Sequence, residues 1–77
     1  MSRVTVYLRT PLYSSGGASA HLPAGVHTIE GVMADRDASS VRVDAERLLD
    51  DRGRELLDEA VTLIVPWAKV DHMVVLA

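Results

Sequence analysis

The stretch "LIVPWAKVDHMVVLA", residues 63–77, decides how this chain is interpreted. It holds two apolar runs, separated by a Pro-Trp pair and a short charged step. Proline lacks a backbone N–H and fixes its own φ, so it interrupts a strand without starting a regular ladder. The first run begins at Val61, and residues 61–65 predict a strand buried on both faces. The second run, from Val70 onward, predicts the last strand of the protein.

Three earlier segments also carry strand patterns. Residues 3–9, RVTVYLR, alternate apolar and polar side chains with the period of two that a half-buried strand requires. Residues 26–34, VHTIEGVMA, predict a second strand, in which Gly31 indicates a bulge or a close approach of neighbouring backbone. Residues 41–45, VRVDA, alternate again, after a turn that Asp and Ser favour over residues 35–40.

A long loop follows the first predicted strand. Thr10-Pro11 is expected to end that strand, and the segment LYSSGGASAHLPAG, residues 12–25, is rich in Ser, Gly and Ala. We therefore expect a flexible loop over about residues 11–25. Loops of this length in a compact domain are commonly functional or disordered, so a small-ligand site under residues 12–25 is one function to consider.

Residues 44–60, DAERLLDDRGRELLDEA, fit two structures. In a helix, the Leu and Ala side chains would share one face, but Gly53 would sit inside it at a cost of about 1 kcal/mol. In a hairpin, Asp50, Asp51 and Gly53 would form the tip, where glycine adopts a positive φ easily. We favour the hairpin, with a short helix within residues 45–60 as the alternative.

Composition limits the class of protein. A chain of 77 residues with 48% hydrophobic content predicts a single domain, residues 1–77, and the absence of Cys excludes disulfides and thiolate metal sites. A formal net charge of −3 disfavours electrostatic binding of nucleic acid by the domain as a whole. The start MSRVTVYL lacks the apolar region of a signal peptide, and no apolar run reaches the length of a membrane span. We expect a soluble cytoplasmic domain without membrane contacts.

Two segments carry a resemblance to a known fold. Gly31 and Asp37 lie six positions apart in GVMADRD, and "VPWAKVDHM", residues 65–73, has the form of two strands separated by a short break. The chain from about residue 26 to 77 thereby resembles the Sm-like barrel, the fold of the Sm proteins and bacterial Hfq. The resemblance implies a mainly β protein, a small five-stranded SH3/Sm-like barrel, with a ring assembled through edge strands.

The departures from that family concern its RNA site. Val41 occupies the position where the family usually has an Asn that contacts a base. Pro66-Trp67 replaces the Arg-Gly of the Sm motif and the Lys-His of Hfq. The resemblance therefore carries the barrel topology to this chain but not the RNA-binding residues. A PRC-type barrel, which also tends to place a Pro at the close of a penultimate strand, is a comparable alternative.

No catalytic motif is present. The histidines His21, His27 and His72 form no H-x-x-x-H pair, and no Ser lies in a G-x-S-x-G elbow. Asp71 and His72 are adjacent on a predicted strand, so their side chains are expected on opposite faces rather than as an acid/base pair. We expect no enzymatic activity, no cofactor and no bound metal.

The candidate interaction residues are Trp67, Tyr7, Tyr13, Pro66 and His72. Trp67 could cap the core or anchor a partner, and we favour the cap. Our leading hypothesis is a non-enzymatic protein-interaction or oligomerisation module that forms homo-oligomers through edge strands, its other partners being unspecified. The alternatives are an Sm-like RNA-binding protein and a small-ligand protein with its site under the loop at residues 12–25.

Overall fold

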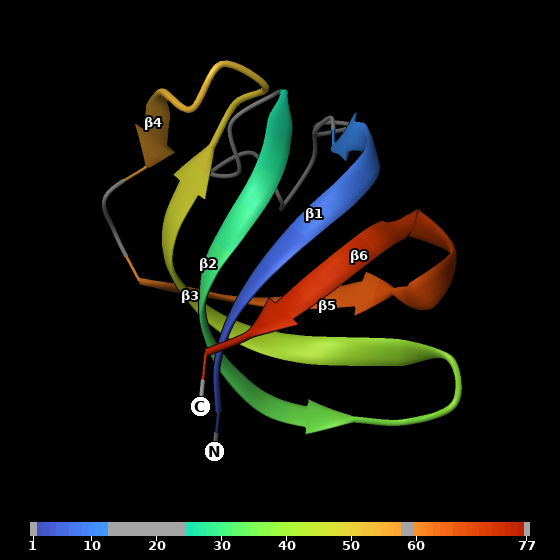
Figure 1. Cartoon of the computed structure of the whole chain (residues 1–77). Helices are drawn as coiled ribbons and strands as arrows, with labels where there is room; N and C mark the ends of the chain where they lie inside the picture. Colours follow the sequence, from blue (N-terminus) through green and yellow to red (C-terminus); the bar gives the residue numbers. More distant parts are fainter. Residues whose placement is uncertain (1, 13–24, 58–59, 77) are drawn as a thin grey trace, which may run out of the picture.

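The computed structural model describes residues 2–12, 25–57 and 60–76, which form one antiparallel sheet (Figure 1). Its elements are the strands β1 (Ser2–Leu12), β2 (Val26–Arg36), β3 (Ser40–Leu49), β4 (Glu55–Leu57), β5 (Val61–Pro66) and β6 (Val70–Val75), with a 3₁₀ turn η2 (Trp67–Lys69) before β6. The hydrogen-bonded order is β4-β3-β2-β1-β6, and β5 pairs with another part of β3. The prediction of a mainly β protein is confirmed.

The region predicted as a hairpin is a hairpin. β3 pairs antiparallel with β4, and Gly53 has a φ of +79° in the turn between them. The carboxylate of Asp50 accepts the N–H groups of Arg52 and Arg54, each at 2.9 Å, and so holds the turn closed. The alternative of a helix is wrong for the described part of residues 45–60. The strand predicted at residues 61–65 is β5, and the short strand β4 is an additional one, so the sheet has six strands.

β3 is longer than the pattern VRVDA indicated, because a bulge resets its alternation. Gly31 of β2 pairs with Ala45, whereas the preceding Glu30 pairs with Arg47, so Glu46 is an extra residue on β3. The bulge turns both Ala45 and Leu48 toward the core, although they are three positions apart. A strict period of two ends at Ala45, and for this reason the sequence pattern ended the strand there.

Gly31 lies against the backbone of β3. A Cβ atom at this position would overlap the carbonyl oxygen of Asp44 and lie 2.8 Å from the Cα of Ala45. Of the two alternatives expected for Gly31, the close approach of backbone is present, and the bulged residue is Glu46 on the neighbouring strand β3.

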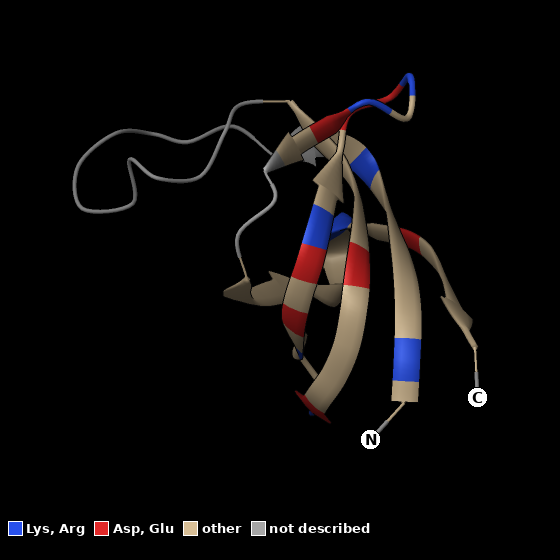
Figure 2. Ribbon diagram, turned by 90° about the vertical axis from the view of Figure 1, so that its left-hand side faces the viewer, with Lys and Arg blue, Asp and Glu red and all other residues tan. Residues whose placement is uncertain are grey.

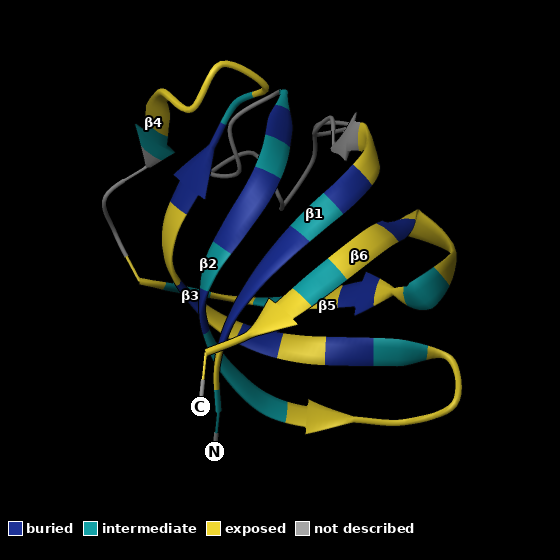
Figure 3. Ribbon diagram, in the orientation of Figure 1, coloured by how far each residue is buried: buried dark blue, intermediate teal, exposed yellow. Residues whose placement is uncertain are grey.

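The core lies on the concave side of the curved sheet. β1 contributes the alternating residues Val4, Val6 and Leu8, all almost completely buried. Figure 3 shows buried and intermediate positions along the middle of β1 and most of β2, and mostly exposed positions on β6. The remaining core residues are Val26, Ile29, Val41, Val43, Ala45, Leu48, Val65 and Val70.

Two predictions about the strands differ from the structure: the end of β1 and the burial of β5. β1 continues through Pro11 to Leu12, because its register with β2 shifts between Tyr7 and Leu12 and the proline is not required to donate to β2. β5 is not buried on both faces, since Ile64 is 69% exposed. β5 also pairs with β3 alone, so it is an edge strand among the described residues.

We predict that Gly31→Ala destabilises the fold by about 3 kcal/mol, because the added methyl group forces β2 away from the backbone of β3. Urea unfolding followed by circular dichroism measures this change. Gly53→Ala is the control, because Gly53 has open space around its Cα and only its positive φ is strained. It should cost about 1 kcal/mol, and an equal or smaller loss for Gly31→Ala would contradict the backbone contact.

Candidate interaction surface

Three strands have one unpaired edge among the described residues: β4, β5 and β6. Of these, β5 and β6 carry the most exposed large apolar side chains. β5 pairs only with β3, and β6 pairs only with β1, among the described residues. The two strands are joined by η2 and are not hydrogen-bonded to each other. Each therefore presents a row of free backbone N–H and C=O groups, which is the usual template for adding another strand.

The β6 edge surface consists of Met73, Val74, Val75 and Leu76. Met73 lies opposite Val6 on the inner face and is partly buried against the core, whereas Val74 lies opposite Thr5 on the outer face. The last three side chains are 40%, 52% and 57% exposed in chain order. The Leu76 N–H donates to the carbonyl of Arg3 at 2.7 Å, so the backbone is held in place up to this residue.

The β5 edge surface consists of Val61, Leu63 and Ile64. Val61 and Leu63 face inward and are only partly buried, although they pack against the core. Ile64 faces outward beside Arg42, its cross-strand neighbour on β3. Both of these edges thus combine free backbone with apolar side chains on each face.

A bulge on β6 brings His72 and Asp71 together. Tyr7 pairs with His72 and Leu8 with Val70, so Asp71 is an extra residue on β6. The Asp71 carboxylate lies 3.1 Å from Nδ1 of His72, and both side chains are exposed. The expectation that these neighbours point to opposite faces is wrong, because the bulge breaks the alternation at Asp71. This bulge is defined by the register between β1 and β6, so the local sequence does not reveal it.

Tyr7 and His72, both predicted as interaction residues, form a stacked pair. Their ring centroids are 4.4 Å apart, with an interplanar angle of 17°. They lie on the outer face of β1 and β6 as direct cross-strand partners. Tyr13 falls outside the described residues, as does His21.

Trp67 packs against the core and links η2 to the turn between β2 and β3. Its indole Nε1–H donates to the carbonyl of Asp37 at 2.7 Å, and its backbone N–H donates to the carbonyl of Ser39 at 3.1 Å. This arrangement matches the capping role that we favoured over the role of a partner anchor. Pro66, the neighbouring candidate, is exposed and pairs with Ser40 at the end of β5.

Asp37 organises that turn. One oxygen of its carboxylate accepts the N–H of Ser39 at 2.7 Å and the N–H of Ser40 at 2.9 Å. The Ser39 hydroxyl donates to the same oxygen at 3.0 Å. These hydrogen bonds favour the ionised form and lower the pKa of Asp37 below its usual value. Its carboxylate therefore closes a turn, as the sequence pattern indicated.

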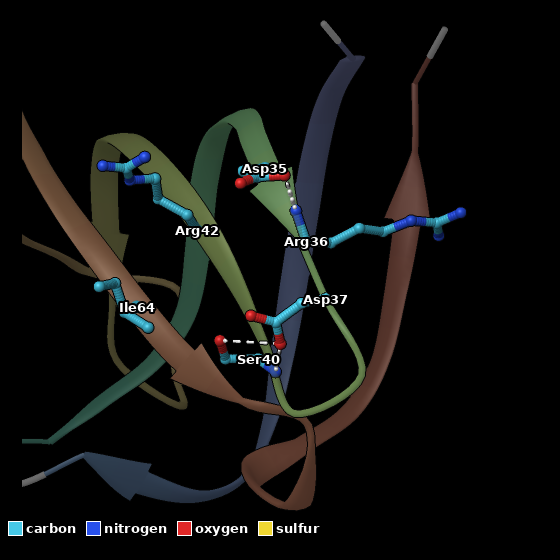
Figure 4. Close-up of a pocket in the computed structure, with 6 residues that line it drawn as sticks. All are labelled: Asp35, Arg36, Asp37, Ser40, Arg42 and Ile64. Atoms are coloured by element: carbon cyan, nitrogen blue, oxygen red, sulfur yellow. Dashed lines mark hydrogen bonds between the residues drawn. The ribbon is translucent and has the colours of Figure 1, made fainter.

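A shallow polar hollow of about 130 Å³ lies beside this turn, lined by Asp35, Arg36, Asp37, Ser40, Arg42 and Ile64 (Figure 4). In the close-up, Arg36 and Arg42 extend away from each other, so their guanidinium groups do not converge on one anion. Asp35 accepts the N–H of Arg36 at 2.8 Å. In the part of the chain that the structure describes, no three His, Asp or Glu side chains gather as metal ligands would.

Comparison with known proteins identifies no relative of this chain. No family model, no curated protein and no solved structure matches this chain. Within the described ranges, none of the helical segments has the length and apolar character needed to cross a membrane.

We predict that acid destabilises this protein partly through Asp37. A carboxyl group whose pKa is lowered by folding stabilises the fold at pH values above its ordinary pKa of 3.8. That contribution is lost as the pH falls through the lower pKa of the folded state. Asp37→Asn should therefore reduce stability at neutral pH and flatten the decline below about pH 4. Urea midpoints measured between neutral pH and about pH 2.5 provide the test.

Asp51→Asn is the matched control for this charge change. Asp51 is an exposed turn residue that accepts no hydrogen bond in the described structure, so its variant should keep the acid dependence of the parent protein. An unchanged acid profile for Asp37→Asn would show that the turn does not depend on the ionised carboxylate.

Proposed function

We propose that this protein is a self-association module in which β5 of one copy pairs with β6 of the next. The proposal extends to the fold: a small SH3/Sm-like barrel whose strands β1, β2, β3, β5 and β6 correspond to the five expected strands. Three features support this correspondence, namely the antiparallel order, the return of β6 to β1, and the 3₁₀ turn between β5 and β6.

The observation that carries the proposal is the presence of two apolar open edges on one sheet. Exposed apolar edge strands promote uncontrolled aggregation unless another chain or element covers them. Val74 and Val75 on β6 and Ile64 on β5 are the large apolar side chains most exposed within these two strands. Pairing of β5 with β6 of a second copy would cover both edges with one kind of contact.

The side-chain patterns of the two edges are compatible in an antiparallel register that sets Ile64 opposite Val74. Both residues face outward in their own strands. The same register sets Leu63 opposite Val75 and Val65 opposite Met73 on the inner face, so it would join the cores of the two copies. On the outer face, Pro66 would lie opposite His72, beside the stacked Tyr7.

This contact uses a different edge on each copy, so it is heterologous. Heterologous contacts close into a ring when the rotation between copies allows it, and otherwise form filaments. A contact of β6 with β6, or of β5 with β5, would instead stop at a dimer. The β5–β6 contact and the symmetric contacts therefore predict different oligomers when a β5-edge variant is mixed with a β6-edge variant.

We predict that Val74→Lys shifts the protein from an oligomer to its chain mass of 8.4 kDa in sedimentation velocity runs. A lysine at this position places a charge where apolar burial contributes about 1.5–3 kcal/mol. Ala38→Lys adds the same charge in an exposed turn and should leave the oligomer intact. A monomeric parent protein at tens of micromolar would contradict self-association.

Mixing two edge variants tests the pairing itself. Val74→Lys keeps an intact β5 edge, and Ile64→Lys keeps an intact β6 edge, so we predict that each alone is monomeric and that an equal mixture forms a dimer. The mixed dimer cannot grow, because both of its outer edges carry a lysine. If Ile64→Lys forms dimers by itself, a symmetric β6 contact replaces the proposed one.

A further inference from the structure

A second hollow, larger than the one beside the Asp37 turn, lies where β5 begins to pair with β3. Its volume is about 510 Å³, and its walls include apolar Val32, Ala45 and Val61 and polar Asp44, Glu46 and Thr62. This volume falls within the range of about 300–1,000 Å³ that is usual for small-molecule sites.

The bulge on β3 explains the position of the hollow. β3 pairs with β5 only as far as Ala45, opposite Val61, and its pairing with β4 resumes at Leu48. Between these points Glu46 is the extra residue, so the strand bends and its edge lacks a partner in the described structure.

The charge lining the hollow is negative. Asp44 and Glu46 are two positions apart on β3, and both are exposed. Glu46 forms an ion pair with Arg3 at 2.5 Å. Asp44 accepts a hydrogen bond from the Thr62 hydroxyl at 2.9 Å and has no cationic partner among the described residues. Figure 2 shows acidic and basic positions interleaved along the strands.

We infer that this hollow binds a primary alkylammonium ion. The ammonium group would donate hydrogen bonds to the free lone pairs of Asp44, and the alkyl chain would lie along Val32, the cross-strand partner of Asp44 on the same face. A cationic head on an aliphatic stem places each part in its preferred environment. An alkyl carboxylate would meet like charge at Asp44, and a neutral alcohol would lack the charge-assisted hydrogen bond.

The site shares Val61 with the β5 edge surface but uses no residue of β6. It is built within one chain, and its charged group lies on β3, which belongs to neither open edge. The Val74→Lys variant should therefore bind the amine as tightly as the parent protein. Loss of binding in that variant would contradict a site contained in a single chain.

The test is a titration of the ¹⁵N-labelled full chain with pentylammonium chloride, followed by amide chemical shifts. We expect saturable shifts at Asp44, Val61 and Thr62, with pentanol and sodium pentanoate at the same concentrations binding at least about fivefold more weakly. Affinity should rise from methylammonium to pentylammonium, by up to about fourfold for each fully buried methylene. An Nα-acetyl-lysine methylamide titration distinguishes a lysine side chain from a free amine as the source of the group.

Asp44→Asn is the decisive variant, because an amide oxygen can still accept the hydrogen bond from Thr62 while the charge is removed. It should weaken pentylammonium binding about fivefold or more. Asp51→Asn removes one charge from the exposed β3–β4 turn and should leave the affinity unchanged. Equal losses in the two variants, or shifts that do not saturate, would reduce the effect to general electrostatic attraction and overturn the inference.

Discussion

The contact between the backbones of β2 and β3 at Gly31 governs how this sheet curves. Only a residue without a Cβ allows the carbonyl of Asp44 to lie so close, and the bulge at Glu46 directly follows this contact. Bulges increase the local bend and twist of a strand. The bend lets one long strand, β3, pair with β5 in its first half and with β4 near its end. The position of the β5 edge and of the larger hollow follows from that division of β3, whereas the β6 edge depends on the pairing of β6 with β1.

The turn between β2 and β3 shows how polar groups hold the other end of the sheet. Asp37 collects the N–H groups of two serines, and the indole of Trp67 donates to the Asp37 carbonyl. One residue thus connects its own turn to η2, a segment thirty positions away. Because η2 leads directly into β6, this link also positions the strand that carries the exposed apolar edge. Trp67 thus packs against the core and connects two segments that are distant in the sequence.

The proposed contact and the proposed amine site use different physical properties of the same sheet. At the edges, free backbone groups and exposed apolar side chains favour another strand. In the hollow, an unneutralised carboxylate next to apolar walls favours a small cation with an aliphatic body. A bulge is involved near both features, at Asp71 on β6 and at Glu46 on β3. Both features thus lie on strands whose pairing is interrupted by a bulge.

The sequence alone predicted a mainly β chain and the turn at Asp37. It favoured a hairpin at Gly53 over a helix, and indicated a bulge or a close approach at Gly31. Each of these depends on local properties: the period of two, a side chain that bonds its own backbone, or the conformational freedom of glycine. The tertiary structure decided which strands were edges, how far β3 extends, and that Asp71 and His72 meet. Those features depend on register between distant segments, and a single extra residue in one strand changes which face every later side chain occupies.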